Sequence, residues 1–174
     1  MNTLIQTHPN KWLLLVGPRS IRSTMMILIA RLAERDAVHV LDSGGQFDGY
    51  LISRSLRGRT DFLKRVSLSR TFTCYQVLAS LENAVGLPAP LIVLDFLHTF
   101  YDESISFAER RRLLERCIPH LERLSKPAGG AVSIHLPAVP SPEADTLFAI
   151  LKEAAPEIWI QEIPVQVPQP ARLF

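Results

Sequence analysis

Residues that could bind a phosphate or a metal ion stand where apolar runs of the chain end. Gly17 follows the run Trp12–Val16 and opens a loop, and Asp42 and Asp95 each end a later run. A loop that leads into a helix can hold an anion with its backbone N–H groups. An aspartate at such a point can ligate a metal ion, although acids at strand ends more often cap or pair locally. These positions are therefore the first candidates for a ligand site.

Other chemistries find no support in the spacing of the reactive residues. No His/Cys/Asp/Glu group has metal-ligand spacing, and no serine stands in a nucleophile-elbow pattern. Cys74 and Cys117 fall on apolar faces of predicted helices, where a free cysteine behaves as a small hydrophobic residue. We expect neither a disulfide nor a metal site. His98 and His135 are interpreted as ordinary loop residues.

The elements that must position these residues alternate between strand and helix along 174 residues. Apolar runs predict strands, and helical periodicity predicts the segments between them. This alternation favours a three-layer α/β/α domain with a mainly parallel sheet. We expect one domain over residues 1–163 and a Pro-rich tail over 164–174. The three most apolar strands, Leu13–Val16, Val38–Leu41 and Leu91–Phe96, are predicted to be adjacent in the interior of the sheet.

One helix has a clear predicted start. Thr73 and Gln76 have the spacing of a capping box, and Phe72 and Val77 occupy the two positions of a hydrophobic staple. The pattern predicts that Phe72 packs against Val77 at the beginning of this helix.

A longer helix is predicted to begin at Ser106, which forms a second capping box with Glu109. Pro119 lies inside it and should kink it. The run Arg110–Arg112 faces Glu109 and Glu115 across helical spacing, so we expect an outer face with salt bridges.

Three strand ends together resemble the ATPase core of the RecA/RadA recombinase superfamily. Leu14–Gly17, followed by a loop and a helix, stands at the position of the phosphate-binding loop. Val38–Phe47 is similar to the family's strand that ends in Asp-Thr-Glu-Gly-x-Phe, and Leu91–Asp95 is similar to its second nucleotide motif. Between them, Ser69–Gln76 resembles the segment that leads into the helix before that motif in archaeal-type recombinases. The resemblance spans about Leu13 to Ile134. It implies a RecA-like P-loop NTPase fold.

The phosphate-binding loop departs from the family's pattern. A working loop reads Gly-x-x-x-x-Gly-Lys-Ser/Thr, and the same register here keeps only Gly17 and Thr24. Arg22 replaces the second glycine, which lets the backbone turn its N–H groups toward the phosphates. Ser23 replaces the lysine, whose charge-assisted contact is worth roughly 1.5–3 kcal/mol. The loop is interpreted as a simple strand-to-helix turn or, alternatively, as an altered anion site that uses Arg19, Arg22 and the helix N-terminus.

Two further positions that the family uses in catalysis are also changed. The resemblance implies that a glutamate at position 44 would activate the attacking water, but the residue is Gly44. His135 and Leu136 stand where an Asn-Gln pair is expected. We therefore expect no catalytic residues and no working ATP or magnesium cofactor. Any remaining nucleotide contact would come from Gly17, Arg19, Arg22, Ser23, Thr24 and Asp95.

The formal net charge is only +2, so no general attraction for nucleic acid or membranes is expected. One stretch is locally basic and is opposed there only by Asp61. Its residues are interpreted as a solvated connection or, alternatively, as a weak DNA-binding patch. They are Arg54, Arg57, Arg59, Lys64, Arg65 and Arg70. No signal peptide or membrane span is evident, so the expected compartment is the cytosol.

The tail places two large apolar residues, Leu173 and Phe174, after a Pro- and Gln-rich spacer. So short a segment cannot bury them by itself, so we expect them to dock on this domain, on a second copy or on another protein. The last alternative resembles the short terminal peptides by which bacterial repair proteins hold the replication sliding clamp.

These observations predict a non-catalytic RecA-like protein. It would be an accessory or regulatory factor in DNA recombination or repair that acts through protein contacts and weak DNA contacts. A protein partner or a homo-oligomer is expected. The alternatives are a RecA-like ATP-binding protein that retains weak nucleotide binding or ATPase activity, and a structural assembly protein.

Overall fold

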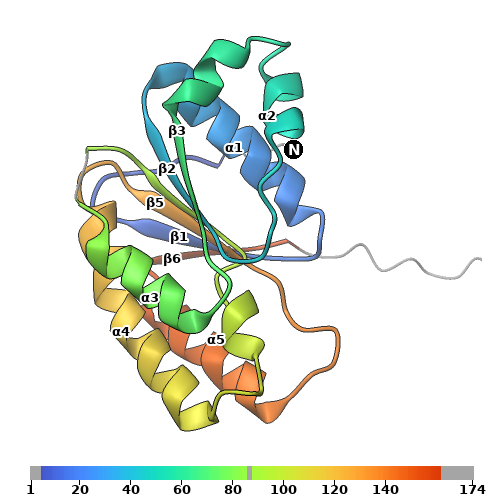
Figure 1. Cartoon of the computed structure of the whole chain (residues 1–174), viewed down its shortest axis with the longest axis vertical. Helices are drawn as coiled ribbons and strands as arrows, with labels where there is room; N and C mark the ends of the chain where they lie inside the picture. Colours follow the sequence, from blue (N-terminus) through green and yellow to red (C-terminus); the bar gives the residue numbers. More distant parts are fainter. Residues whose placement is uncertain (1–4, 86–87, 162–174) are drawn as a thin grey trace, which may run out of the picture.

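The computed structural model describes residues 5–85 and 88–161. Figure 1 shows an α/β fold. In the described residues, its sheet has six parallel strands in the order β3-β2-β4-β5-β1-β6. The predicted α/β class and parallel sheet are thus confirmed. The predicted tail, with Leu173 and Phe174, lies outside the described residues. The strands are β1 Trp12–Val16, β2 Val38–Asp42, β3 Val66–Arg70, β4 Leu91–Leu94, β5 Gly130–Ile134 and β6 Glu157–Ile160.

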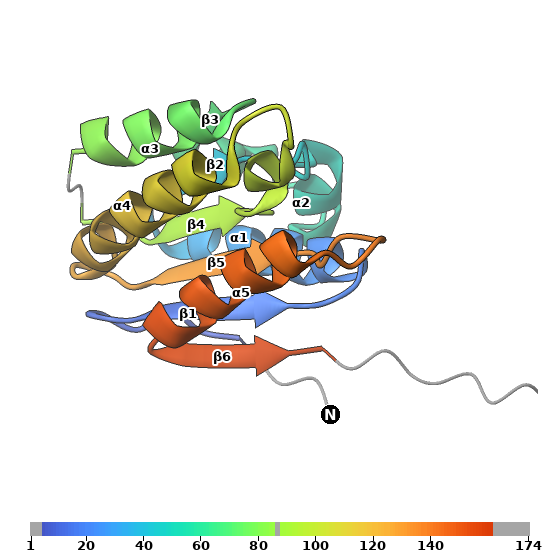
Figure 2. The same ribbon diagram turned by 90° about the horizontal axis from the view of Figure 1, so that it is seen from below.

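Helices cover both faces of the sheet (Figures 1 and 2). On one face lie α1 Ile21–Arg35 and α2 Gly49–Ser55, together with the short 3₁₀ helix η1 Thr60–Arg65. On the other lie α3 Cys74–Asn83, α4 Phe107–Ser125 and α5 Pro142–Ala154, and a second 3₁₀ helix, η2 His98–Tyr101, follows β4. Among the residues that the structure describes, no helix combines the length and apolar character that crossing a membrane requires.

The prediction that the three most apolar strands are adjacent is wrong in one respect. β2 and β4 are neighbours, but β5 lies between β4 and β1. Gly130 fits this central place because a Cβ atom there would come within 2.9 Å of the Leu91 carbonyl oxygen and 3.5 Å of Trp12 Cβ. An apolar run predicts burial on both faces, but it carries no information about which strands flank it.

Alternate residues of the strands feed two apolar cores, one on each face of the sheet. Leu14 and Val16 pack with α3, α4 and α5, whereas Leu15 packs with α1. Both cysteines are buried in the first core as free thiols, as predicted. Burial raises the pKa of Cys117 to about 12, so this thiol stays protonated and unreactive.

The start of α3 is capped as predicted, but the staple is wrong. Thr73 Oγ1 accepts a hydrogen bond from the Gln76 N–H, while Gln76 Oε1 accepts from the Phe72 N–H. Phe72 is 79% exposed, whereas Val77 is fully buried. The chain reaches α3 from the edge strand β3, where no other element of the described residues covers Phe72.

In α4 the predicted cap and two predicted ion pairs are confirmed. Ser106 Oγ accepts from the Glu109 N–H, and α4 continues through Pro119 to Ser125. Arg111 pairs with Glu115, and Arg112 pairs with Glu109. The prediction for Arg110 is wrong, because its side chain is buried.

The buried Arg110 side chain joins three segments of the chain. It donates to the carbonyl oxygens of Phe100 and Ile105 at 3.1 and 2.9 Å and pairs with Glu143 of α5. Successive helical residues point about 100° apart, so a run of three arginines cannot share one face.

Candidate functional site

The loops that follow β1, β2, β4 and β5 all lie at the carboxyl ends of the strands, on the same side of the molecule, because the strands are parallel. The loop after Gly17, the β2–α2 loop, Asp95 and His135 are therefore neighbours at the carboxyl ends of the strands. The residues that the resemblance singles out for nucleotide binding therefore converge, and their contacts decide what they can bind.

The loop after Gly17 uses its own backbone donors internally. The N–H groups of Ile21, Arg22 and Ser23 donate to the carbonyl oxygens three residues earlier, at 2.9, 3.2 and 3.1 Å. These are first-turn donors of α1, which would have to point at a bound phosphate. A Cβ atom at Gly17 would lie 3.0 Å from Gln161 Cβ, so the close approach of Gln161 accounts for this glycine. These contacts favour the simple strand-to-helix turn.

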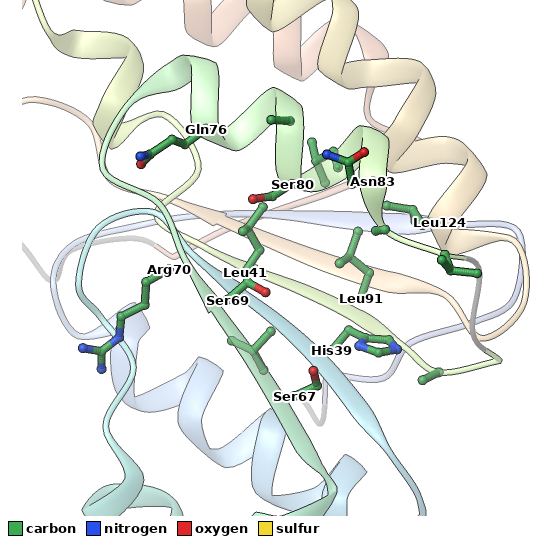
Figure 3. Close-up of a pocket in the computed structure, with 16 residues that line it drawn as sticks. His39, Leu41, Ser67, Ser69, Arg70, Gln76, Ser80, Asn83, Leu91 and Leu124 are labelled. Carbon is green, nitrogen blue, oxygen red and sulfur yellow. The ribbon is translucent and has the colours of Figure 1, made fainter.

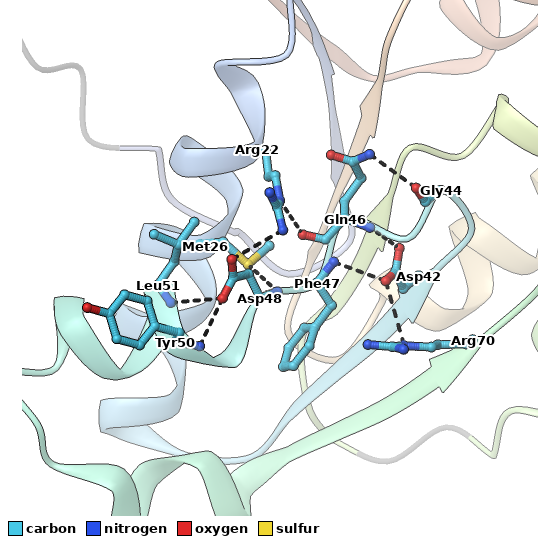
Figure 4. Close-up of polar contacts among 10 residues, drawn as sticks. All are labelled: Arg22, Met26, Asp42, Gly44, Gln46, Phe47, Asp48, Tyr50, Leu51 and Arg70. Carbon is cyan, nitrogen blue, oxygen red and sulfur yellow. Dashed lines mark hydrogen bonds and ion pairs between the residues drawn. The ribbon is translucent and has the colours of Figure 1, made fainter.

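Arg22 contacts the β2–α2 loop (Figure 4). Its Nε donates to the Gln46 carbonyl oxygen at 2.8 Å, and its Nη2 lies 3.2 Å from Asp48 Oδ2. Asp48 in turn caps α2 by accepting from the N–H groups of Tyr50 and Leu51. Arg22 therefore ties α1 to the start of α2. Arg19 and Ser23 are exposed, and Thr24 is half-buried.

Asp42 closes the β2–α2 loop on itself. Its buried carboxylate accepts from the N–H groups of Gln46 and Phe47 at 2.8 and 3.0 Å, and Arg70 Nε lies 4.0 Å away (Figure 4). A carboxylate in two such hydrogen bonds is a local turn cap. This agrees with the structural interpretation of Asp42 in the sequence.

Asp95 occupies the space beside Gly44. A Cβ atom at Gly44 would lie 2.4 Å from Asp95 Oδ2 and 2.6 Å from Asp95 Cβ. Asp95 itself adopts a left-handed backbone conformation, with φ 51°, and its N–H donates to Ser133 Oγ at 3.0 Å. A side chain at position 44 and the present position of Asp95 are therefore mutually exclusive.

Two histidines, His98 and His135, lie against Asp95. The sequence interpretation of both as ordinary loop residues did not predict this contact. His135 Nδ1 lies 3.1 Å from Asp95 Oδ1, and His98 Nδ1 lies 3.6 Å from Oδ2. The Tyr101 hydroxyl donates to the His135 carbonyl oxygen, and burial raises the pKa of Tyr101, with a further contribution from the charge of Asp95. Only the placement of β5 beside β4 brings His135 here, so no sequence spacing could have found it.

Within residues 5–85 and 88–161, no group of three or more His, Cys, Asp and Glu side chains is arranged to hold a metal ion. The carboxylate of Asp95 is 7% exposed and is already in contact with the two imidazoles. Its contacts are those of a buried residue that joins η2 to the loop after β5.

The six basic residues of the predicted patch are all exposed, but three of them are held by the fold. Arg59 pairs with Glu34, and Arg65 donates to the carbonyl oxygens of Ala33 and Glu34. Both guanidinium groups lie over the Phe62 ring, at 5.1 and 4.9 Å from its centroid. Arg70 faces Asp42, as described above. Arg54, Arg57 and Lys64 make no ion pair with another described residue.

A cavity of about 580 Å³ lies between β2, β3 and α3 (Figure 3). Leu41, Leu91 and Leu124 form apolar parts of its lining, and Ser67 and Ser69 of β3 contribute hydroxyl groups. Arg70 is the charged side chain among its lining residues. The cavity forms because α3 packs mainly on α4, which leaves this end of the sheet face uncovered. No sequence pattern pointed to it, since the alternating serines of β3 resemble an ordinary solvated strand.

No known family model matches this chain, and no curated protein matches it.

Proposed function

We propose that this chain is a non-catalytic RecA-like protein that binds protein partners as an accessory or regulatory factor in DNA recombination or repair. The observation that carries the proposal is that the polar groups at the nucleotide-site positions already have hydrogen-bond or ion-pair partners within the fold. The first-turn N–H groups of α1, the Arg22 guanidinium and the Asp95 carboxylate all have partners within the fold.

Each of these contacts opposes nucleotide chemistry for a separate reason. Donors that bond to loop carbonyls cannot also hold a phosphate. Gly44 cannot act as a base, and the space that a glutamate would need is filled by Asp95. Phosphoryl transfer depends on positioned charge around the phosphate, and the Arg22 guanidinium is engaged by Gln46 and Asp48 instead.

Support for a binding role comes from the cavity between β2, β3 and α3. A cavity of this size with an apolar lining and a few polar groups has the chemistry of a recognition site. It lies beside an edge strand whose residues are mostly exposed, so an extended segment of a partner could reach both the strand and the cavity.

Calorimetric titration with ATP and magnesium tests the proposal. We expect no binding heat and no magnesium-dependent turnover above background. The double substitution Arg22→Gly and Ser23→Lys should improve phosphate binding without turnover, because Gly44 remains. An Arg22→Gly single variant controls for the lost contacts to Gln46 and Asp48. Magnesium-dependent hydrolysis by the unmodified chain would show that the proposal is wrong.

DNA binding is expected to be weak and to depend on salt. Replacing Arg54, Arg57 and Lys64 by alanine should abolish it, because these cations are not tied to acids of the fold. Replacing Arg111, Arg112 and Arg116 removes the same charge elsewhere and serves as the control. Fluorescence anisotropy with a labelled single strand at two salt concentrations measures the effect. An affinity that neither the first triple substitution nor added salt changes would reject the patch.

A further inference from the structure

The outer edge of β3 is open to another strand. The Thr71 N–H donates to the Asp42 carbonyl oxygen, so odd-numbered residues of this segment direct their backbone groups toward β2. Even-numbered residues direct theirs outward, because backbone groups alternate along a strand. Leu68 therefore presents its N–H and C=O at the free edge. Such an edge is a template for pairing with a further strand.

At the opposite edge of the sheet, the chain leaves β6 with a distinctive sequence. The Gln161 N–H donates to the Val16 carbonyl oxygen, and β1 ends at Val16. The next residues read Ile163-Pro164-Val165-Gln166-Val167-Pro168 and lie outside the described part of the chain. Their apolar residues are all odd-numbered and their prolines are all even-numbered.

This alternation suits a strand that pairs along one edge only. In an extended segment, the odd residues direct their N–H groups to one side and the prolines, which have none, lie on the other. Proline on the outer side is a common feature of edge strands, since it blocks further pairing.

We propose that residues 163–167 of one copy add as a parallel strand to the open β3 edge of a second copy. In β3, Ser67 and Ser69 direct their backbone groups toward β2 and line the cavity. In a parallel strand added outside β3, the residues whose side chains face the cavity would likewise direct their backbone groups inward, which here means toward β3. Its odd residues would pair with β3 while Ile163, Val165 and Val167 project over the cavity face.

The partner must be another copy because the segment cannot reach its own β3. β6 and β3 are the two edges of a six-stranded sheet, about 24 Å apart at the usual strand spacing. Val167 is six residues past Gln161, so a fully extended chain reaches at most about 20 Å. The path around the sheet would be longer than the straight distance between the two edges. The contact would join two different surfaces and could therefore repeat from copy to copy.

Sedimentation velocity of the full chain over a wide concentration range tests this inference, which rests on the proposed binding role. We expect self-association, and we expect Leu68→Pro to abolish it. Proline at this position removes the N–H that points to the free edge but leaves the hydrogen bonds between β3 and β2 in place. Leu68→Thr keeps that N–H and is the matched control. Val165→Asp should also abolish association, whereas Gln166→Asp, on the opposite face of the segment, should not. Circular dichroism checks that each variant is folded.

A chain that stays monomeric at every concentration would overturn the inference. Association that persists in Val165→Asp would also overturn it. This substitution lies outside β3, so its effect does not depend on whether β3 still folds. Either outcome would leave the proposed lack of ATP turnover untouched, and turnover measured by calorimetry would leave the assembly result untouched. The two proposals can thus fail separately.

Discussion

Gly44→Ala is expected to lower the free energy of unfolding by about 2–3 kcal/mol, the upper range for overpacking a filled site. The added Cβ would meet Asp95 Oδ2 at 2.4 Å and Asp95 Cβ at 2.6 Å. Asp95 cannot move away freely, because its N–H is bonded to Ser133 and its carboxylate contacts His135. Gly44 does not have a positive φ, so the cost is steric.

Urea denaturation measures this effect, and a second glycine of the same loop region provides the control. Gly49 begins α2, and a Cβ atom added there would have Phe47 Cε1 as its nearest neighbour, at 3.8 Å. Gly49→Ala should therefore be neutral or slightly stabilising. In an Asp95→Gly background, Gly44→Ala should cost less than about 1 kcal/mol, because the clashing atoms are gone. An equal cost in both backgrounds would contradict the steric explanation.

The same geometry bears on function. A glutamate at position 44 would need Asp95 to vacate its place, and Asp95 would then lose its contacts with His98 and His135. Gly44→Glu should therefore destabilise the chain.

Arg110→Met should also destabilise the chain strongly, with a loss of about 3 kcal/mol in the free energy of unfolding. The Arg110 side chain is 4% exposed and bonds to the carbonyl oxygens of Phe100 and Ile105. Methionine fills similar space but leaves both carbonyls without this donor. It also removes the ion pair with Glu143 that joins α4 to α5.

Arg111→Met is the matched control, because this neighbouring side chain is about half exposed and pairs only with Glu115. Exposed ion pairs contribute little, so this variant should unfold at nearly the same urea concentration as the unmodified chain. Equal midpoints for Arg110→Met and Arg111→Met would contradict the structural role assigned to Arg110.

Local features of the fold follow from the sequence alone. Capping side chains predicted the starts of α3 and α4, because these signals act within a few residues. The parallel sheet followed from the alternation of strands and helices.

Features that depend on packing between distant segments could not be predicted. The insertion of β5 between β4 and β1, the burial of Arg110 and the exposure of Phe72 each depend on which elements become neighbours. The contact of His135 with Asp95 joins residues 40 positions apart and exists only because β4 and β5 pair.

The order of residues alone shows Arg22, Ser23 and Gly44 at the positions where the resemblance to RecA-like ATPases would require a glycine, a lysine and a glutamate. The contacts that take the place of those residues emerge only in the folded chain, because they join the ends of different strands. The cavity beside β3 has the same origin. A strand's sequence shows which residues alternate, but the three-dimensional packing of α3 on α4 determines which sheet face remains uncovered.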